Sequence, residues 1–179
     1  MIKLERKQLT INEYIAGFSP LGYYLATGKI SACLATTGAA TKLSICGLSD
    51  AKFHNIPAIY LIALNSTPSI GKSPLQDVSH HGINLIPQLE AELGEDCIVI
   101  DNIQELSFKM EKVFSILKKS KPVAILFRPD VLCLPITLDV PKPQTSHFAF
   151  CKEDMEAFLL NFPKHIEGRR VVIFVSSEA

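Results

Sequence analysis

The sequence predicts an α/β protein with a three-layer α/β/α arrangement around a mainly parallel sheet. Short apolar runs alternate with stretches of helical periodicity along most of the 179 residues, which is the pattern of strand–helix–strand units. The run IPAIYLIAL, residues 56–64, is continuously apolar, as is typical of a parallel strand buried on both faces. Residues 104–120, QELSFKMEKVFSILKKS, instead place their apolar side chains along one face of a helix.

Five apolar runs are the candidate strands of this sheet. The first, within KQLTI, ends just before Glu13, and the second, KISACLATT, ends in a glycine turn at Gly38. Because helical patterns lie between the runs, and parallel neighbours need such crossovers, we expect all five in one sheet. They are predicted near residues 8–12, 30–36, 57–64, 97–101 and 122–127.

The helices are expected in the intervals between these strands. The first contains Pro20, which a helix tolerates best in its first turn because proline has no backbone N–H to donate. Residues 65–77 are rich in Ser, Pro and Gly and are predicted to form a loop. The predicted helices cover residues 14–27, 39–53, 83–93, 104–120 and 152–166, and a last apolar strand, RRVVIFVSS, follows them.

The composition argues against several classes of protein. The chain has 18 basic and 18 acidic residues, so its charge gives no support to nucleic-acid binding or to binding an anionic membrane. The five cysteines are scattered and show no C-x-x-C spacing, which favours buried thiols of a cytoplasmic protein over zinc ligands. The first ten residues are too polar for a signal peptide, and no apolar run is long enough to cross a bilayer.

Glu13 is the first candidate for a functional residue. It is the only charged residue from residue 12 to residue 28, within a segment rich in Gly, Ala, Tyr and Phe. One interpretation is an acid at a helix N-terminus, where the helix dipole favours a negative charge. The other is a sequestered acid in an apolar cleft, where a carboxylate can act on a ligand. The pattern leaves both interpretations open.

Two other segments contain residue types that bind ligands. The turn TTGAATKL contains Gly38 between a strand and a helix, where glycine allows either a ligand or another backbone to approach closely. It is neither a Rossmann fingerprint nor a P-loop. His80 and His81 are adjacent, so their side chains point in different directions and a shared metal is not expected.

The order of several short motifs resembles a known domain. Glu13 is followed in register by GYYLATGK, CLATTGAA, GLSDA and NIPAIYLIAL. This order resembles the pyrimidine-binding (Pyr) domain of thiamine-diphosphate-dependent enzymes, in the acetolactate synthase and pyruvate oxidase group. PLQDV places Gln76 where the family has Phe-Gln-Glu, and KPVAILFRPDV resembles the strand that closes the domain. The chain departs from the family pattern at Asn12, Ala40 and Leu43, where the family has His, Gly and Asn.

The resemblance implies a cofactor and residues that contact it. In the family, a Glu at the position of Glu13 hydrogen-bonds a ring nitrogen of the aminopyrimidine of thiamine diphosphate, so Glu13 is the expected catalytic residue. Gly38, its neighbours Thr37 and Ala39, and Gln76 are expected to bind the cofactor. No metal ligand is expected in this chain. The implied function is the pyrimidine-binding domain of a lyase or transferase, a 2-keto acid decarboxylase or carboligase, with no activity expected from the isolated chain. The alternative is a non-catalytic assembly or binding module that keeps the fold.

The resemblance also implies a domain organisation and partners. Residues 1–135 correspond to a Pyr domain without the family's first strand and helix, residues 136–147 to a linker, and residues 148–179 to the start of a middle domain. The G-D-G…N motif of the pyrophosphate-binding domain is absent from this sequence, so Mg²⁺ is expected on a separate domain or subunit. A fragment, a subunit of a split enzyme and a degenerate remnant all stay open. The family shares its cofactor between subunits, so a dimer or tetramer is expected. Its predicted contact faces, on the helices after Glu13 and Gly38, contain Ala16, Phe18, Leu21, Tyr24, Ile45 and Leu48.

Overall fold

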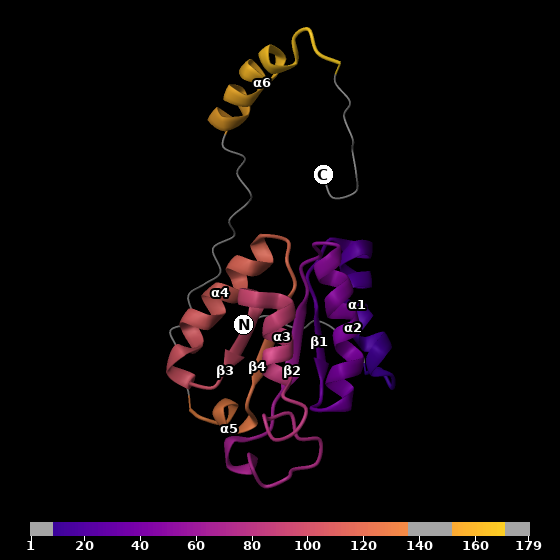
Figure 1. Ribbon diagram of the computed structural model, residues 1–179, viewed down its shortest axis with the longest axis vertical. Coiled ribbons are helices and arrows are strands. Elements are labelled where there is room, and N and C mark those ends of the chain that lie inside the picture. The colour runs from indigo at the N-terminus through magenta and orange to yellow at the C-terminus, as the bar shows by residue number, and fades with distance from the viewer. Residues whose placement is uncertain (1–8, 136–151, 171–179) are drawn as a thin grey trace. The chain divides into compact units, whose positions relative to one another are not determined.

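A computed structural model describes residues 9–135 and 152–170, with side chains described from residue 156 onward in the second range. Its centre is a four-stranded sheet in which every strand is parallel to its neighbours (Figure 1). The strands are β1 (Ala32–Ala35), β2 (Ile59–Ala63), β3 (Cys97–Ile100) and β4 (Val123–Phe127), in the order β1-β2-β4-β3. Helices pack on both faces of this sheet, which confirms the predicted fold class.

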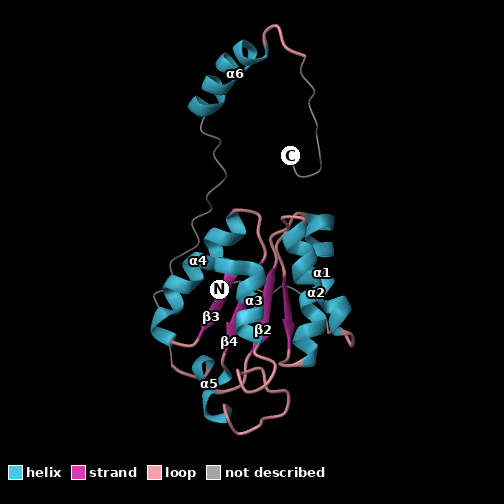
Figure 2. Cartoon of the chain, in the orientation of Figure 1, coloured by secondary structure: helices cyan, strands magenta, loops and turns pink. Residues whose placement is uncertain are grey.

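The helices lie close to their predicted positions (Figure 2). They are α1 (Glu13–Thr27), α2 (Ala39–Phe53), α3 (Leu85–Leu93), α4 (Leu106–Lys118) and the short α5 (Pro129–Leu132). Short 3₁₀ turns cover Thr67–Ser69, Gly94–Asp96 and Ile103–Glu105. No helix in the described ranges is both long and apolar enough to cross a membrane.

The chain divides into two compact units, residues 1–138 and 139–179, and each is considered by itself. The described part of the second unit contains α6 (Lys152–Ile166), which agrees with the predicted helix. Phe158 and Phe162 stack on this helix with ring centroids 5.1 Å apart. The predicted linker at 136–147 and most of the predicted last strand lie outside the described residues, so both stay predictions.

The core has one cluster of apolar side chains on each face of the sheet. Tyr60 and Ile62 of β2 and Leu126 of β4 point into the first cluster with α1, α2 and α3. Ile98 and Ile125 point into the second cluster with α4. The alternation of side chains along each strand therefore divides the core into two halves, as expected for buried parallel strands.

The strand predicted near residues 8–12 is wrong for the residues that the structure describes. Leu9 is 94% exposed and Ile11 is 100% exposed, and no strand in the described ranges lies beside the free edge of β1. A short apolar run forms a strand only when a neighbour accepts its backbone hydrogen bonds. Here Asn12 instead caps α1, because its Oδ1 accepts a hydrogen bond from the Ile15 backbone N–H at 3.2 Å.

Pro20 lies in the second turn of α1, beyond the first-turn position expected from the sequence. A proline there removes the hydrogen bond to the carbonyl four residues earlier. The Pro20 side chain is fully buried, so tertiary packing of α1 offsets part of that loss. Tyr60 adds to this packing, because its hydroxyl donates a 2.9 Å hydrogen bond to the carbonyl of Gly17. Burial raises the pKa of the Tyr60 phenol, so it stays a neutral donor.

Two glycines allow α1 and α2 to approach within backbone contact. A Cβ on Gly17 would lie 2.1 Å from the Ser44 carbonyl oxygen, and a Cβ on Gly47 would lie 2.1 Å from the Gly17 carbonyl oxygen. Real Cβ atoms do not come this close to backbone atoms. The interface therefore requires glycine at both positions because of space, since neither has a left-handed backbone.

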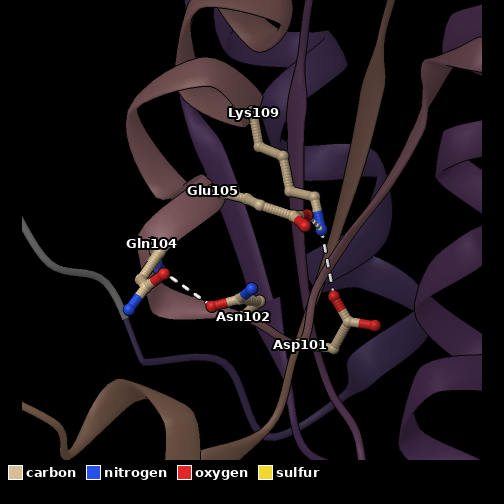
Figure 3. Close-up of polar contacts among 5 residues, drawn as sticks. All are labelled: Asp101, Asn102, Gln104, Glu105 and Lys109. Atoms are coloured by element: carbon tan, nitrogen blue, oxygen red, sulfur yellow. Dashed lines mark hydrogen bonds and ion pairs between the residues drawn. The ribbon is translucent and has the colours of Figure 1, made fainter.

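On the other face of the sheet, an ion-pair cluster joins the end of β3 to α4 (Figure 3). Lys109 Nζ lies 3.0 Å from Asp101 Oδ1 and 2.7 Å from Glu105 Oε2. The hydrogen bond from Lys109 holds the pKa of the Asp101 carboxyl below its usual value. Asp101 and Glu105 are both more than half exposed, so each ion pair adds at most about 1 kcal/mol to the free energy of unfolding.

Asn102, next to this cluster, caps the 3₁₀ turn that precedes α4. Its side chain accepts a hydrogen bond from the Gln104 backbone N–H at 3.0 Å.

Replacing Gly47 tests the close helix contact. Gly47→Ala should lower the free energy of unfolding by about 2–3 kcal/mol, because the new methyl group forces α1 and α2 apart. The matched control is Gly22→Ala in the exposed middle of α1, where no described atom lies within 4 Å of the added Cβ. That control should raise the free energy of unfolding by about 0.5–1 kcal/mol. Urea denaturation of both variants measures the difference, and equal effects would contradict the contact.

Candidate functional site

The predicted site residues lie on elements that meet at one edge of the sheet. Because α2 follows the carboxyl end of β1, its first residue, Ala39, lies at that edge. The last turn of α1 leads into the amino end of β1, so it lies at the amino edge of the sheet. The first residue of α1, Glu13, is at the other end of the helix and therefore lies near the carboxyl edge. The long loop after β2 lies at the carboxyl edge as well (Figure 1). In open parallel sheets this is the edge at which ligands bind.

Gly38 and Gln76 are in direct contact at this edge, although 38 positions separate them in the sequence. The Ala39 backbone N–H donates a 3.0 Å hydrogen bond to Gln76 Oε1. Gly38 has φ +76° and ψ −125°, and a Cβ there would lie 2.1 Å from Gln76 Oε1. Both the backbone conformation and the space therefore require glycine at position 38. Gln76 itself has φ +57°, which is uncommon for a residue other than glycine.

Thr37 precedes this contact and carries a polar atom without a partner. Its Oγ1 is buried and has no hydrogen-bond partner among the described residues. The adjacent Thr36 forms a hydrogen bond through its backbone: its carbonyl accepts a 2.8 Å hydrogen bond from the Thr41 hydroxyl. A buried hydroxyl without a partner is unfavourable by about 1–3 kcal/mol. Such a group is the kind that a bound ligand satisfies.

Glu13 is the first residue of α1, and it is partly buried. This position agrees with the interpretation as an acid at a helix N-terminus, where it adds about 0.3–1 kcal/mol of stability. Glu13 does not lie at the end of a strand, because residues 9–12 form none. Among the described residues, no hydrogen bond joins Glu13 to Thr37, Gly38 or Gln76, so its role in binding stays a prediction.

His80 and His81 lie in the loop after β2 with ring centroids 3.9 Å apart, so the prediction that their side chains point in different directions is wrong. His81 and Asp77 line a shallow polar hollow together with Gly71, Ser73 and Pro74. Hydrogen bonds from Ser79 hold the pKa of the Asp77 carboxyl below its usual value. No group of three or more potential metal ligands occurs in the part of the chain that the structure describes.

Long-range hydrogen bonds anchor the loop after β2. Asn65 is 8% exposed and accepts a 2.7 Å hydrogen bond from the Val78 backbone N–H through Oδ1. Arg128 Nη1 donates a 2.8 Å hydrogen bond to the carbonyl of Asn65, and Asp130 Oδ1 accepts one from the Thr67 N–H at 3.1 Å. These partners lie 13 to 63 positions apart, so local sequence patterns do not reveal them. The only available signal is an Asn placed directly after a buried strand.

A family model matches the first half of the chain. Residues 6–84 match the model of the thiamine pyrophosphate enzyme N-terminal TPP binding domain, and this range includes Glu13, Thr37, Gly38, Ala39 and Gln76.

Similar curated proteins point to the same family. The acetolactate synthase isozyme 2 large subunit of Escherichia coli (strain K12) is 28% identical over 131 residues, which are 73% of this chain and 21% of that protein. The acetolactate synthase large subunit of Cyanidium caldarium is 26% identical over 140 residues, 78% of this chain and 21% of that protein. A putative uncharacterized protein of Haemophilus influenzae is 31% identical over 74 residues, 41% of this chain and 28% of that protein. The chain therefore spans about a fifth of the length of the two synthase subunits.

Replacing Gly38 separates backbone strain from contact with Gln76. Gly38→Ala should lower the free energy of unfolding by about 1–3 kcal/mol through strain, and by a further 1–3 kcal/mol through the clash. Gly94→Ala is the matched control, because Gly94 has φ +58° and ψ −124° but no described atom lies within 4 Å of its added Cβ. Urea denaturation should show the larger loss for Gly38→Ala, and the difference should shrink in a Gln76→Gly background. Equal losses in the two variants would contradict the contact.

Proposed function

We propose that this chain provides the pyrimidine-binding part of a thiamine-diphosphate-dependent enzyme, because residues 6–84 match the model of the thiamine pyrophosphate enzyme N-terminal TPP binding domain. The proposed reaction class is decarboxylation or carboligation of 2-keto acids, carried out by a lyase or transferase. The acetolactate synthase relatives support this class. Since the chain spans about a fifth of their length, the activity belongs to a larger assembly.

The buried Thr37 hydroxyl carries the proposal. It has no hydrogen-bond partner among the described residues. It belongs to the residue before Gly38, and the Gln76 side chain packs against Gly38. An aminopyrimidine ring carries hydrogen-bond donors and acceptors on a flat apolar body, which fits a hydroxyl, an amide oxygen and backbone groups around a glycine turn. The residues present therefore fit the pyrimidine half of the cofactor.

Each of these residues has a distinct part in the proposal. Glu13 holds a proton at a ring nitrogen of the pyrimidine, Thr37 hydrogen-bonds the ring through its hydroxyl, and Gln76 fixes the backbone at Gly38 and Ala39. When bound, thiamine diphosphate supplies the electron sink for carbanion chemistry. We assign its diphosphate and Mg²⁺ to a separate pyrophosphate-binding domain or subunit.

Self-association through α1 and α2 is part of the same proposal, but through other side chains than the sequence suggested. Leu48 is fully buried, so it offers no surface to a partner. Ala16, Leu21, Tyr24 and Ile45 are partly buried against the core, and Phe18 is also partly buried, so they offer less apolar surface than the sequence suggested.

The outward faces of the two helices carry other apolar side chains. Ile15 is 59% exposed, Leu25 is 68% exposed and Leu43 is 46% exposed. Apolar side chains grouped on one surface favour association.

A cytoplasmic location completes the proposal. Cys33 is buried, but Cys46 and Cys133 are exposed, so the prediction of buried thiols is wrong for these two. Cys33, Cys46, Cys97 and Cys133 form no disulfide with one another or with another described residue, which is compatible with a reducing compartment.

Titration of the ¹⁵N-labelled chain with thiamine tests the function. We expect saturable shifts of the Thr37, Gly38 and Ala39 amide signals with a dissociation constant of about 1 mM, because only half of the cofactor is recognised. Glu13→Gln should weaken this binding about 10- to 100-fold, since it removes a hydrogen bond to a charged group. Glu111→Gln on α4 is the matched control and should leave binding unchanged. Thiamine diphosphate with Mg²⁺ should bind no more tightly than thiamine.

Two outcomes would overturn parts of this proposal. If thiamine does not shift the amide signals of Thr37, Gly38 and Ala39, the proposal of pyrimidine binding is wrong. That result would favour the non-catalytic module. Unchanged thiamine binding by Glu13→Gln, together with a loss of about 0.3–1 kcal/mol in the free energy of unfolding, would leave Glu13 as a helix N-terminal acid only.

Sedimentation velocity tests the proposed association. The chain should sediment as a dimer or larger species, and the double substitution Ile15→Lys, Leu25→Lys should shift it to a monomer, because two charges would then face the partner. Phe114→Lys is the matched control, since Phe114 is 40% exposed on α4, on the other face of the sheet. A wild-type chain that sediments as a monomer at every concentration would contradict the association.

A further inference from the structure

We propose that Asn65 is a positioning residue for the site, because it holds Gln76 in the conformation that closes against Gly38. This inference deepens the proposed function and rests on it for the consequence in ligand binding. The contact between Asn65 and Gln76 itself can be tested without any ligand.

Asn65 connects two strands to the loop that carries Gln76. It lies two residues after the end of β2, and its carbonyl accepts the 2.8 Å hydrogen bond from Arg128, which follows β4 directly. Its side chain reaches in the other direction: Oδ1 accepts from the Val78 N–H at 2.7 Å, and Nδ2 lies 3.5 Å from the Gln76 carbonyl oxygen. The buried Asn65 amide therefore holds the backbone on both sides of Asp77.

Gln76 needs such support because its backbone conformation is unfavourable for a residue with a side chain. With φ +57°, it relies on surrounding contacts to keep this conformation. Its side chain is mostly exposed apart from its contacts with Gly38 and Ala39. The loop around it contains Gly71 and Ser73, both with positive φ, and no regular strand or helix holds it.

The contacts form one continuous path along the carboxyl edge. Arg128 at the end of β4 binds Asn65 at the end of β2, Asn65 binds the backbone beside Gln76, and Gln76 binds Ala39 after β1. Three neighbouring strands of the sheet are thus linked through side chains. A change at Asn65 should therefore reach the Ala39 amide, although no hydrogen bond joins the two residues directly.

Amide hydrogen exchange in the ¹⁵N-labelled chain tests this path. Asn65→Leu removes the acceptor for Val78 at similar side-chain size. It should accelerate exchange of the Val78 and Ala39 amides at least tenfold more than exchange of core amides such as those of Ile62 and Leu126. Asn65→Asp keeps the acceptor for the Val78 N–H but replaces the Nδ2 donor with an oxygen that faces the Gln76 carbonyl. It should therefore restore nearly wild-type exchange of the Val78 amide and leave exchange of the Ala39 amide accelerated.

The matched control is Asn102→Leu. Asn102 follows β3 and also accepts a backbone hydrogen bond, from Gln104, but it lies outside the path (Figure 3). It should leave the Ala39 amide unchanged. If Asn65→Leu does not fold, Asn65→Ser provides the same comparison with a smaller perturbation. A purely structural role of Asn65 would accelerate all amides by the same factor, and that result would overturn the proposal.

Thiamine titration of the same samples separates this proposal from the proposed function. If both hold, Asn65→Leu weakens thiamine binding about tenfold, and Asn65→Asp, which also lacks the donor to the Gln76 carbonyl, weakens it as well. If wild-type chain binds no thiamine, the proposed function fails, while the selective exchange of Ala39 still decides whether Asn65 positions Gln76. If the Ala39 amide exchanges at the wild-type rate in Asn65→Leu and thiamine binding is normal, the positioning role of Asn65 is overturned and the proposed function stands.

Discussion

The contact between the backbones of α1 and α2 at Gly17 and Gly47 determines where the rest of the candidate site can lie. Since α1 and α2 touch without intervening side chains, the N-terminus of α1 is held beside the N-terminus of α2. The Tyr60 hydroxyl then joins α1 to β2 through the Gly17 carbonyl. A larger residue at either glycine would separate Glu13 from the turn at Gly38, even though neither glycine lies in the site.

The carboxyl edge of the sheet has a second set of constraints, which are polar. Gly38 accepts the side chain of Gln76, and the loop that carries Gln76 is anchored to the ends of β2 and β4 by Asn65, Arg128 and Asp130. The buried Thr37 hydroxyl is the one side-chain polar atom recorded as buried and unpaired in the described residues.

Much of this fold could be predicted from local patterns, because local chemistry decides it. The continuous apolar run IPAIYLIAL predicted β2, and the segment 39–53 predicted α2 with the same ends that the structure shows. Gly38 and Gln76 could be selected from the family resemblance, but not their direct contact. Two predictions were wrong for tertiary reasons. The strand near residues 8–12 would need a neighbouring strand, and Pro20 is accommodated beyond the first turn of α1 because its side chain is packed in the core. Asn65 was missed because its partners lie far away in the sequence.

The strand order has a consequence for synthesis on the ribosome. Of the four strands of this sheet, β4 is the last to be made, yet it lies between β2 and β3 and supplies backbone partners to both. Until Phe127 has left the exit tunnel, β3 has no neighbour in this sheet, and Arg128 is not yet present to bind Asn65. Chains released early, before residue 123, would expose the apolar edges of β2 and β3 together, and such edges recruit other strands.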